Sequence, residues 1–418
     1  MSYASPAQTR KIATASIMGN LLEFYDFTLF GFLAPVIARL FFPTDNPITS
    51  LWLSFSAFAL GFMTRPLGGI LFGHIGDKYG RKVALSYSIL LISIPTAMIG
   101  LMPTYETIGL WAPISIVLLR LCQGLCAGGE YNGAALFLLE HTDPKRRGFL
   151  SGVVTTGGVA GGLTGSAVAA FVTNDMLPDY FWRFAFLIGL VAGIVGFYIR
   201  RNLPETPEFK AAAKQVKKTT VPFLEVFKHS KWGVFSVIGV ASVCGGVYYT
   251  QISFINAYFS QVLGMNLSHV LGLITPVLFL NILLLIVLGK TSDRVGSHKQ
   301  MMWSALGLMV VAYPIFVLLN QATYLSVILA HLVMVTFTAG FVAPSHAVMM
   351  ACFKPEYRYS GVAISFSIGM TAFGGTSPVL FLYLINKTGW VYAPVPFLMF
   401  YALFGFVGVW QAKRKLQK

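Results

Sequence analysis

Long apolar runs separated by short polar segments are the dominant pattern along this chain. They predict membrane spans at 13–36, 51–74, 83–102, 112–139, 148–173, 182–200, 232–260, 269–289, 301–319, 324–350, 360–384 and 392–411. A helix of about 20 apolar residues crosses the hydrocarbon core of a bilayer, and each run is close to that length or exceeds it. We therefore predict an all-α membrane protein with twelve transmembrane helices.

The single long polar interruption covers residues 201–231, is rich in lysine and proline, and separates two sets of six spans. We expect an N-terminal six-helix bundle over 1–200, a cytoplasmic central loop over 201–231 and a C-terminal six-helix bundle over 232–418. The loop either rests on anionic lipid or is simply solvated, and the sequence favours neither.

Composition agrees with a membrane protein. Of 418 residues, 56% are hydrophobic and 11% are charged, and the mean hydropathy is +0.71, which excludes a soluble globule. The lysines and arginines behind the net charge of +15 lie in alternate loops. The loops on the opposite side contain only three basic residues, Arg39, Arg183 and Lys387. By the positive-inside rule both termini and the central loop are cytoplasmic, and nucleic acid is not an expected partner.

The four cysteines lie in or beside apolar runs, so we predict neither a disulfide framework nor a metal site. No HExxH or GxSxG motif is present, and an enzyme is not expected. We also predict no cofactor.

The two halves share a short repeat. Three residues after the second span recur after the eighth at a constant offset of 216 positions: Gly73, Asp77 and Gly80 correspond to Gly289, Asp293 and Gly296. Pro144 and Arg147 correspond more weakly to Pro355 and Arg358. This repeat predicts two related bundles with a substrate site near the midplane between them.

Two segments resemble the major facilitator superfamily: GHIGDKYGRK (73–82) and RLCQGLCAGGE (120–130). More narrowly, four segments resemble the metabolite:proton symporters: GNLLEFYDFTLFG (19–31), TRPLGGILFGHIGD (64–77), GGEYNGA (128–134) and RRNLPETPEF (200–209). That group includes carriers for proline and betaine, citrate, 2-oxoglutarate and shikimate. In the second copy of the loop motif, Ser297 and His298 replace the basic pair Arg81 and Lys82.

Apart from Arg183 and Arg200 at the two ends of the span 182–200, five charges fall within the predicted spans, and all five are in the N-terminal half: Glu23, Asp26, Arg65, Arg120 and Glu130. Glu23 and Asp26 share one helical face. A charge inside a bilayer costs about 2.5–3.5 kcal/mol on the lenient scales. The two acids therefore form either a proton or ion relay, which we favour, or a polar contact that fixes helix packing.

Helical rise places Asp26 and Arg120 at similar depth, and Glu23 and Glu130 likewise. A buried carboxylate that separates from its arginine takes up a proton, and releases it when they meet again. Asp26 and Arg120 form such a switch or a permanent salt bridge. The resemblance to proton-coupled sugar carriers implies the switch. Glu23 and Glu130 are a second proton site or bind a cationic part of the substrate.

The family resemblance also implies a cytoplasmic gate, in which the loop motif forms ion pairs and binds the N-terminus of a neighbouring helix. The expected gate residues are Gly73, Asp77, Gly80, Arg81, Arg147 and Asp293. Either Arg147 or the start of the eleventh span, near Tyr359 and Ser360, is the expected partner of Asp77. Alternatively, these charges only determine on which side of the membrane the loop lies.

Candidate substrate contacts combine polar and aromatic side chains: Tyr25, Arg65, Gln123, Tyr248, Tyr249, Gln251, Asn256 and Asn281. Arg65 either captures a carboxylate or is structural. Three acids against two arginines leave the expected cavity mildly negative, which favours a zwitterion, a cation, or an anion carried with protons.

We therefore predict a proton-coupled symporter that imports a small organic metabolite, a carboxylate or a zwitterion such as proline or betaine, by alternating access. The alternatives are a uniporter or antiporter of an organic acid, or a transporter-like membrane sensor. The expected partners are the small-molecule substrate, protons and the lipid bilayer. We expect a monomer, and the family resemblance implies a bacterial inner membrane.

Overall fold

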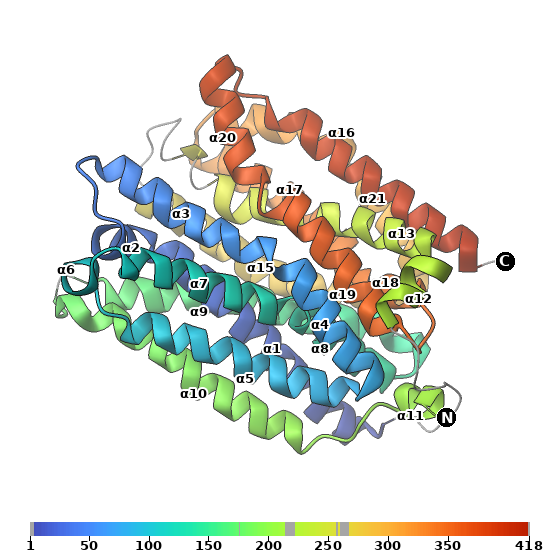
Figure 1. Ribbon diagram of the computed structural model, residues 1–418. Coiled ribbons are helices and arrows are strands. Elements are labelled where there is room, and N and C mark those ends of the chain that lie inside the picture. The colour runs from blue at the N-terminus through green and yellow to red at the C-terminus, as the bar shows by residue number, and fades with distance from the viewer. Residues whose placement is uncertain (1–3, 175, 214–221, 256–257, 260–266, 417–418) are drawn as a thin grey trace. The chain divides into compact units, whose positions relative to one another are not determined.

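The computed structural model describes residues 4–174, 176–213, 222–255, 258–259 and 267–416 (Figure 1). Eleven helices of this described chain are long and apolar enough to cross a membrane, and a bent pair would make a twelfth. The eleven segments are Thr49–Lys78, Arg81–Leu101, Trp111–Glu140, Pro144–Val172, Asp179–Arg201, Lys231–Ile252, Thr275–Val295, Ser297–Asn320, Tyr324–Ala351, Arg358–Thr388 and Pro394–Leu416. The predicted all-α membrane fold is confirmed.

The first span differs from the continuous helix expected over 13–36. It consists of α1 (Pro6–Phe32) and α2 (Ala34–Phe41), which are bent by 60° at Leu33. Pro35 lies in the first turn of α2. Proline has no amide hydrogen and its ring clashes with the carbonyl four residues earlier, so a straight helix cannot continue through this position.

The chain forms two compact units. The first comprises Met1–His141, Gly157–Phe223 and Pro355–Ile364, and the second comprises Thr142–Thr156, Leu224–Lys354 and Ser365–Lys418. Three of the described helices are thus divided between the units: α9 (Arg147–Val172), α12 (Pro222–His229) and α19 (Arg358–Gly369). The division at 1–200, 201–231 and 232–418 stays a prediction.

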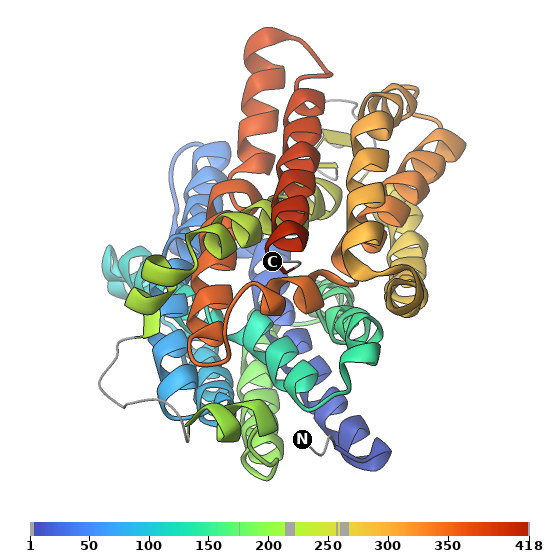
Figure 2. The ribbon, with the colours of Figure 1, turned by 90° about the vertical axis from the view of Figure 1, so that its right-hand side faces the viewer.

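In the first unit, α5 (Arg81–Leu101) lies along α10 (Trp182–Arg201) (Figures 1 and 2). The other helices of this unit are α3 (Pro47–Met63), α4 (Arg65–Lys78), α6 (Tyr105–Ile108), α7 (Trp111–Ala127), α8 (Glu130–Glu140) and α11 (Pro207–Ala213).

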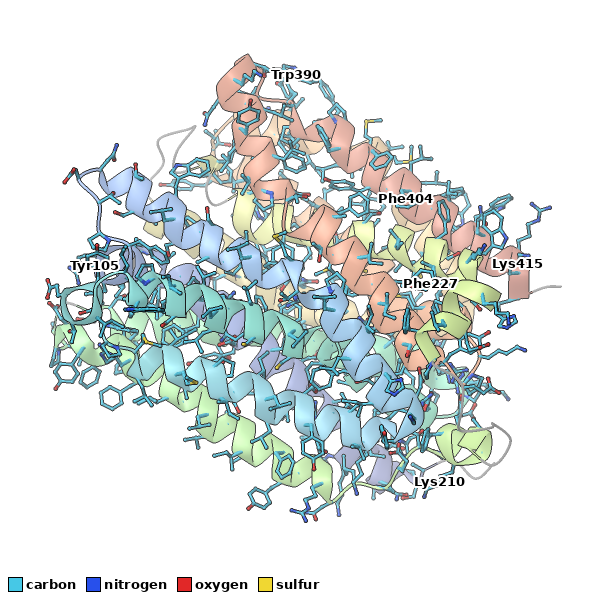
Figure 3. All side chains as sticks on the ribbon, in the orientation of Figure 1. Tyr105, Lys210, Phe227, Trp390, Phe404 and Lys415 are labelled. Atoms are coloured by element: carbon cyan, nitrogen blue, oxygen red, sulfur yellow. The ribbon has the colours of Figure 1, made fainter. Side chains whose placement is uncertain are left out.

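The described residues of the second unit form α-helices and π-helical stretches. The helices are α12 (Pro222–His229), α13 (Lys231–Ala241), α15 (Leu267–Val295), α16 (Ser297–Asn320), α17 (Tyr324–Val342), α18 (Ser345–Ala351), α20 (Ser377–Thr388) and α21 (Pro394–Leu416). The π-helical stretches are Ser242–Val247, Thr250–Phe254 and Met370–Gly374. Trp390 lies near the start of α21 and Lys415 at its opposite end (Figure 3).

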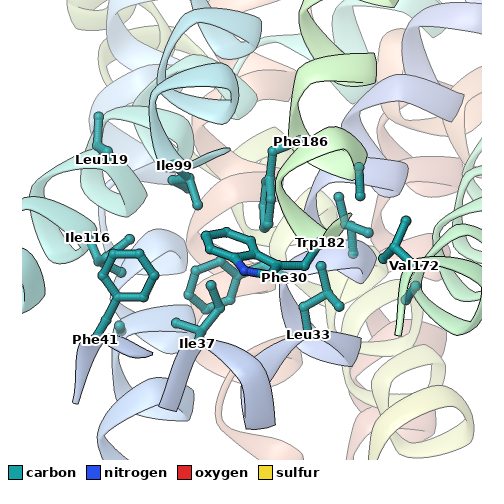
Figure 4. Close-up of a cluster of buried hydrophobic side chains, with 14 of the residues drawn as sticks. Phe30, Leu33, Ile37, Phe41, Ile99, Ile116, Leu119, Val172, Trp182 and Phe186 are labelled. Atoms are coloured by element: carbon teal, nitrogen blue, oxygen red, sulfur yellow. The ribbon is translucent and has the colours of Figure 1, made fainter. Parts of the chain in front are cut away.

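A hydrophobic cluster fixes the bent first span in the first unit (Figure 4). Phe41 of α2 meets Trp182 of α10 edge to face, with ring centroids 5.9 Å apart, the arrangement that aromatic quadrupoles favour. Tyr25 belongs to the same cluster, and its hydroxyl donates a hydrogen bond of 2.7 Å to the carbonyl of Ala185. The cluster thereby sets the position of α1, which carries both acids of the first span.

Glycines of α9 allow close packing on α1. A Cβ at Gly157 would lie 2.5 Å from the carbonyl oxygen of Ile17, and one at Gly161 would lie 2.3 Å from that of Leu21. Only hydrogen fits at these two positions. Small residues provide this kind of close approach between membrane helices.

Candidate functional site

Asp26 is buried on α1 and is surrounded by hydrogen-bond donors. The hydroxyl of Thr96, on α5, donates to Oδ1 at 2.8 Å. The amide of Gln123, on α7, donates to Oδ1 at 2.9 Å and to Oδ2 at 2.7 Å. Three helices therefore converge on one carboxylate, and its donors hold it in a fixed position.

Arg120 lies one helical turn before Gln123 and is also fully buried. Its Nη1 is 3.9 Å from Asp26 Oδ2 and donates to Gln123 Oε1 at 2.9 Å. The guanidinium carbon lies 4.4 Å from the ring centroid of Phe30 and 4.7 Å from that of Phe27. Rings stabilise the cation by cation–π attraction. The depth estimate from the sequence correctly placed Asp26 and Arg120 together, but Gln123 bridges them.

Glu23 forms an ion pair with Arg65 on α4. Arg65 Nη2 is 3.0 Å from Glu23 Oε1, and both side chains are buried. The Arg65 guanidinium also stacks on Phe27 at 4.3 Å and on Phe62 at 4.9 Å. Arg65 therefore has a partner within its own unit, and a substrate carboxylate would have to compete with Glu23 for it.

Glu130, the first residue of α8, pairs with Arg200 near the end of α10. Arg200 Nη2 lies 2.6 Å from Glu130 Oε1, and Nη1 donates to Oε2 at 2.9 Å. The sequence analysis counted five charges within the spans and did not include Arg200, at the end of the span 182–200. That count was too low, because Arg200 turns inward from the helix end and is only 4% exposed.

This correction changes the charge balance of the first unit. The three acids Glu23, Asp26 and Glu130 face Arg65, Arg120 and Arg200 respectively. The expected negative excess is absent among these groups. Charge balance therefore gives no preference for a cationic substrate.

Asp77, at the end of α4, binds the first turn of α19. Its Oδ1 accepts from the backbone amide of Tyr359 at 3.1 Å, and Oδ2 accepts from that of Ser360 at 2.8 Å. Arg81 lies one turn away, with Nη1 3.2 Å from Asp77 Oδ1. A carboxylate at a helix N-terminus satisfies unpaired amides and interacts favourably with the helix dipole. Of the two partners expected for Asp77, the start of the eleventh span is the one present.

Glu140, at the end of α8, is a buried hub that the sequence analysis missed. Arg81 Nε lies 3.2 Å from its Oε2, and Arg358 Nη1 lies 3.1 Å from its Oε1. Thr206, in the segment after α10, donates to Oε2 at 2.7 Å. Arg358 also pairs with Glu208 of α11. The hub thus connects α5, α8, α19 and the start of the central segment.

Glu205 holds the beginning of α5. Its Oε2 accepts a hydrogen bond of 3.1 Å from the backbone amide of Lys82, and burial raises the pKa of this carboxyl group. Gly80 precedes the helix with φ of +117°, and a Cβ there would lie 2.2 Å from Glu205 Oε2. Both the backbone conformation and the close carboxylate require glycine at this position.

The second copy of the repeat has the same construction. Asp293 Oδ1 accepts from the amide of Gly148 at 2.7 Å, and Oδ2 accepts from that of Phe149 at 3.0 Å. These amides belong to the first turn of α9, whose first residue is Arg147. Gly296 has φ of +100° and precedes α16, as Gly80 precedes α5. Each aspartate of the repeat therefore binds the start of a helix that is divided between the two units. We call the two contacts the Asp77 clasp and the Asp293 clasp.

The candidate residues of the C-terminal half are less tightly organised. The rings of Tyr248 and Tyr249 meet nearly at right angles, 5.5 Å apart. Gln251 donates to the hydroxyl of Thr338 at 3.1 Å, and Asn281 is buried on α15. Asn256 lies outside the described residues.

The described residues contain no group of three or more histidine, cysteine or acidic side chains that would hold a metal ion. All four cysteines are free thiols.

Comparisons with known proteins agree with this fold. The family model of the Major Facilitator Superfamily matches residues 17–364. A putative proline/betaine transporter of Staphylococcus aureus (strain COL) is 32% identical over 406 residues, which cover 96% of this chain and 87% of that protein. The proline/betaine transporter of Escherichia coli (strain K12) is 31% identical over 412 residues, covering 95% and 82%.

Two solved structures have similar folds. One is the proton:xylose symporter XylE bound to 6-bromo-6-deoxy-D-glucose, with a TM-score of 0.80, 15% identity, and coverage of 97% and 95% of the two chains. The other is the human organic anion transporter MFSD10, with a TM-score of 0.68, 16% identity, and coverage of 98% and 100%.

The helical fold and these relatives define an integral membrane transporter rather than an enzyme. The chain belongs to the Major Facilitator Superfamily. The resemblance noted from the sequence motifs is confirmed.

Proposed function

We propose that the protein is a proton-driven symporter that imports a small organic metabolite by alternating access. The observation that carries this proposal is the buried carboxylate of Asp26, with Arg120 at 3.9 Å and the Gln123 amide between them. A carboxylate in this environment exchanges a proton when its counter-charge moves, whereas an arginine stays charged.

Asp26 serves as the principal proton site. When it is ionised, both of its oxygens accept hydrogen bonds from Gln123, and Gln123 in turn accepts from Arg120. Protonation removes the negative charge that orients these donors, and Arg120 is then released to a new partner. A substrate that binds the protonated form more tightly shifts the carrier toward that state.

Glu23 is the second proton site, because it lies on the same helical face as Asp26 and it also faces an arginine, Arg65. Glu130 is the third acid of the coupling group, and its pairing with Arg200 distinguishes it from the other two.

The names of the relatives support a zwitterion as the substrate class. Proline and betaine are small zwitterions, and the two curated relatives bear these names in their descriptions. We assign substrate contacts to Tyr25, Arg65 and Gln123 in the first half and to Tyr248, Tyr249, Gln251, Asn256 and Asn281 in the second. Aromatic faces suit a quaternary ammonium group. A carboxylate would be bound by an arginine.

The Asp77 and Asp293 clasps form the cytoplasmic gate, together with Gly73, Gly80, Arg81 and Arg147. Helix N-terminal contacts of this kind contribute about 0.3–1 kcal/mol each when exposed, and up to about 2 kcal/mol when partly buried. Such contacts are strong enough to bias a conformational equilibrium and weak enough to open during transport.

The protein acts as a monomer in a bacterial inner membrane, with both termini cytoplasmic and its apolar outer surface in contact with lipid. Lysine and arginine at the end of α21, namely Lys413, Arg414 and Lys415, support this orientation by the positive-inside rule.

A pH electrode in lightly buffered proteoliposomes tests the function. Proline, glycine betaine, citrate, 2-oxoglutarate and shikimate are added one at a time, with empty liposomes as the control. External alkalinisation with one compound is the expected result. Tracer uptake without any pH change would instead show the uniporter or antiporter, and binding without uptake would show a sensor.

A further inference from the structure

Arg200 occupies a position that the sequence pattern does not explain. It is the last but one residue of α10, where an arginine usually extends toward the membrane surface. Its neighbour Arg201 is exposed, as expected, but Arg200 is buried. Its guanidinium makes two contacts with Glu130, at 2.6 Å and 2.9 Å, and donates to the carbonyl of Leu85 at 2.9 Å. This side chain is held by α5 and α8 simultaneously.

Gly19 on α1 provides the space for this guanidinium. A Cβ at Gly19 would lie 1.6 Å from Arg200 Nη2 and 2.4 Å from Glu130 Oε1. Arg200 Nη2 also lies 3.5 Å from the carbonyl oxygen of Ala15. The ion pair therefore packs directly against the backbone of α1, one turn before Glu23.

Arg200 faces both carboxylate oxygens of Glu130. Its Nη1 donates a hydrogen bond to Oε2, and its Nη2 lies at ion-pair distance from Oε1. The hydroxyl of Ser88 also donates to Oε2. Charge-assisted contacts of this kind are strong, and a proton on Glu130 would have to displace one of them.

Glu23 differs from Glu130 in this respect. It has an ion pair with Arg65, and it lies one helical turn after Gly19, where a Cβ would be 2.4 Å from Glu130 Oε1. The charged and titratable groups around it are Arg65 from α4, Glu130 from α8, Arg200 from α10, Asp26 on its own helix, and Tyr359 from α19, which faces Glu130 and Arg200. The Tyr359 hydroxyl donates a hydrogen bond of 2.7 Å to the carbonyl oxygen of Gly129.

We propose that Arg200 is a positioning residue that keeps Glu130 ionised beside Glu23, and that the fixed charge of Glu130 sets the pH at which Glu23 exchanges its proton. This inference rests on the proposed function, because it makes Glu23 the second proton site. In this proposal Glu130 does not carry a proton and acts only through its constant negative charge.

Infrared difference spectroscopy of the full chain in proteoliposomes tests the proposal without any substrate. The sample is titrated across the neutral pH range, and the carbonyl band of protonated carboxyl groups is followed. Glu23→Gln and Asp26→Asn assign the bands of these two acids. We expect Glu130→Gln to remove no band, because Glu130 never takes a proton in the wild type.

The Arg200 variants distinguish positioning from mere structural support. Arg200→Gln should create a new carboxyl band, because Glu130 without its partner is neutralised by a proton. Arg200→Lys, which retains the charge, should not create that band. In the Glu130→Gln/Arg200→Gln double variant no buried charge is left unpaired, and the midpoint of the Glu23 band should shift, because both charges that act on Glu23 from this side are gone.

Arg201→Gln is the matched control for folding, with size-exclusion profiles and melting curves recorded for every variant. An unchanged Glu23 midpoint in the folded double variant would overturn the positioning role. Loss of a wild-type band in Glu130→Gln would show that Glu130 itself titrates, and would also overturn it. If no band in the wild type belonged to Glu23 but one belonged to Asp26, only this proposal would fail. If neither acid gave a band, the proton-coupling function would fail too.

Discussion

Arg120 and Asp26 do not touch: Arg120 Nη1 is 3.9 Å from Asp26 Oδ2, beyond the 2.7–3.2 Å of an N–H···O hydrogen bond. The side-chain amide of Gln123 fills the gap. It donates to the carboxylate at 2.7 Å and accepts from the guanidinium at 2.9 Å. The two charges thus interact at ion-pair distance and are also connected through a neutral group that bonds to both.

Gln123→Leu should therefore weaken proton coupling. Leucine has similar volume but neither donates to Asp26 nor accepts from Arg120. A hydrogen bond to a charged group contributes about 1.5–3 kcal/mol, so initial rates of pH-driven uptake should fall by about tenfold or more. The rates are measured in proteoliposomes with the substrate that the alkalinisation screen identifies.

Arg120→Ala is the companion variant and should be more damaging, because it leaves Asp26 without any counter-charge. Gln300→Leu, in the second unit, controls for the loss of a buried glutamine, because the side chain of Gln300 donates to the backbone carbonyls of Leu288 and Gly340. If Gln123→Leu retained wild-type rates and pH dependence, Gln123 would have no coupling role.

Asp77→Asn should weaken the Asp77 clasp. Asparagine keeps one acceptor oxygen but loses the charge that interacts with the amides of Tyr359 and Ser360. A loss of about 1 kcal/mol changes a two-state population roughly fivefold. We expect faster labelling of cysteines introduced on the cytoplasmic side.

Asp293→Asn should act in the same direction, because the Asp293 clasp has the same geometry on Gly148 and Phe149. Asp143→Asn is the control, since Asp143 caps an exposed turn through the amide of Lys145. Equal labelling rates in all three variants and the wild type would remove both clasps from the gate.

Gly19→Ala should destabilise the protein and impair transport. The added methyl would lie 1.6 Å from Arg200 Nη2, so the guanidinium would have to leave its position between α1 and Glu130. Gly162→Ala is the control on α9, where the nearest atom to a Cβ is 3.8 Å away. Melting curves in detergent should show a clear loss for Gly19→Ala only, and similar melting of both variants would contradict the geometry.

Glu140→Gln should cost about 3 kcal/mol of stability, because it leaves Arg81 and Arg358 buried without their shared carboxylate. The measurement is thermal unfolding in detergent. Glu225→Gln is the control, because its pair with His229 is largely exposed and such pairs contribute about 0–1 kcal/mol. Equal melting of the two variants would argue against a hub at Glu140.

The sequence predicted most of the fold, because spans are encoded by local hydropathy that needs no tertiary information. Through the family motif, it also named the start of the eleventh span as one of two expected partners of Asp77. Asp26 and Arg120 were placed together by counting helical rise. These predictions all rest on periodicity or on motifs.

The residues that sequence analysis missed depend on side-chain direction at helix ends. Arg200 and Glu140 each lie at the last turn of a span, where charged residues normally face water, and nothing local distinguishes them from exposed neighbours such as Arg201. A signal for Arg200 existed in Gly19, whose lack of a side chain leaves room for a guanidinium. The bend at Leu33 could have been predicted from Pro35.

The most direct test of the account compares substrate accumulation by the wild type and Asp26→Asn under an imposed pH gradient. The same vesicles then report exchange of labelled for unlabelled substrate without a gradient. The account predicts that the wild type accumulates substrate, and that Asp26→Asn loses accumulation but retains exchange, because only reorientation with a proton is blocked. Normal pH-driven accumulation by Asp26→Asn would contradict the central claim that Asp26 carries the coupled proton.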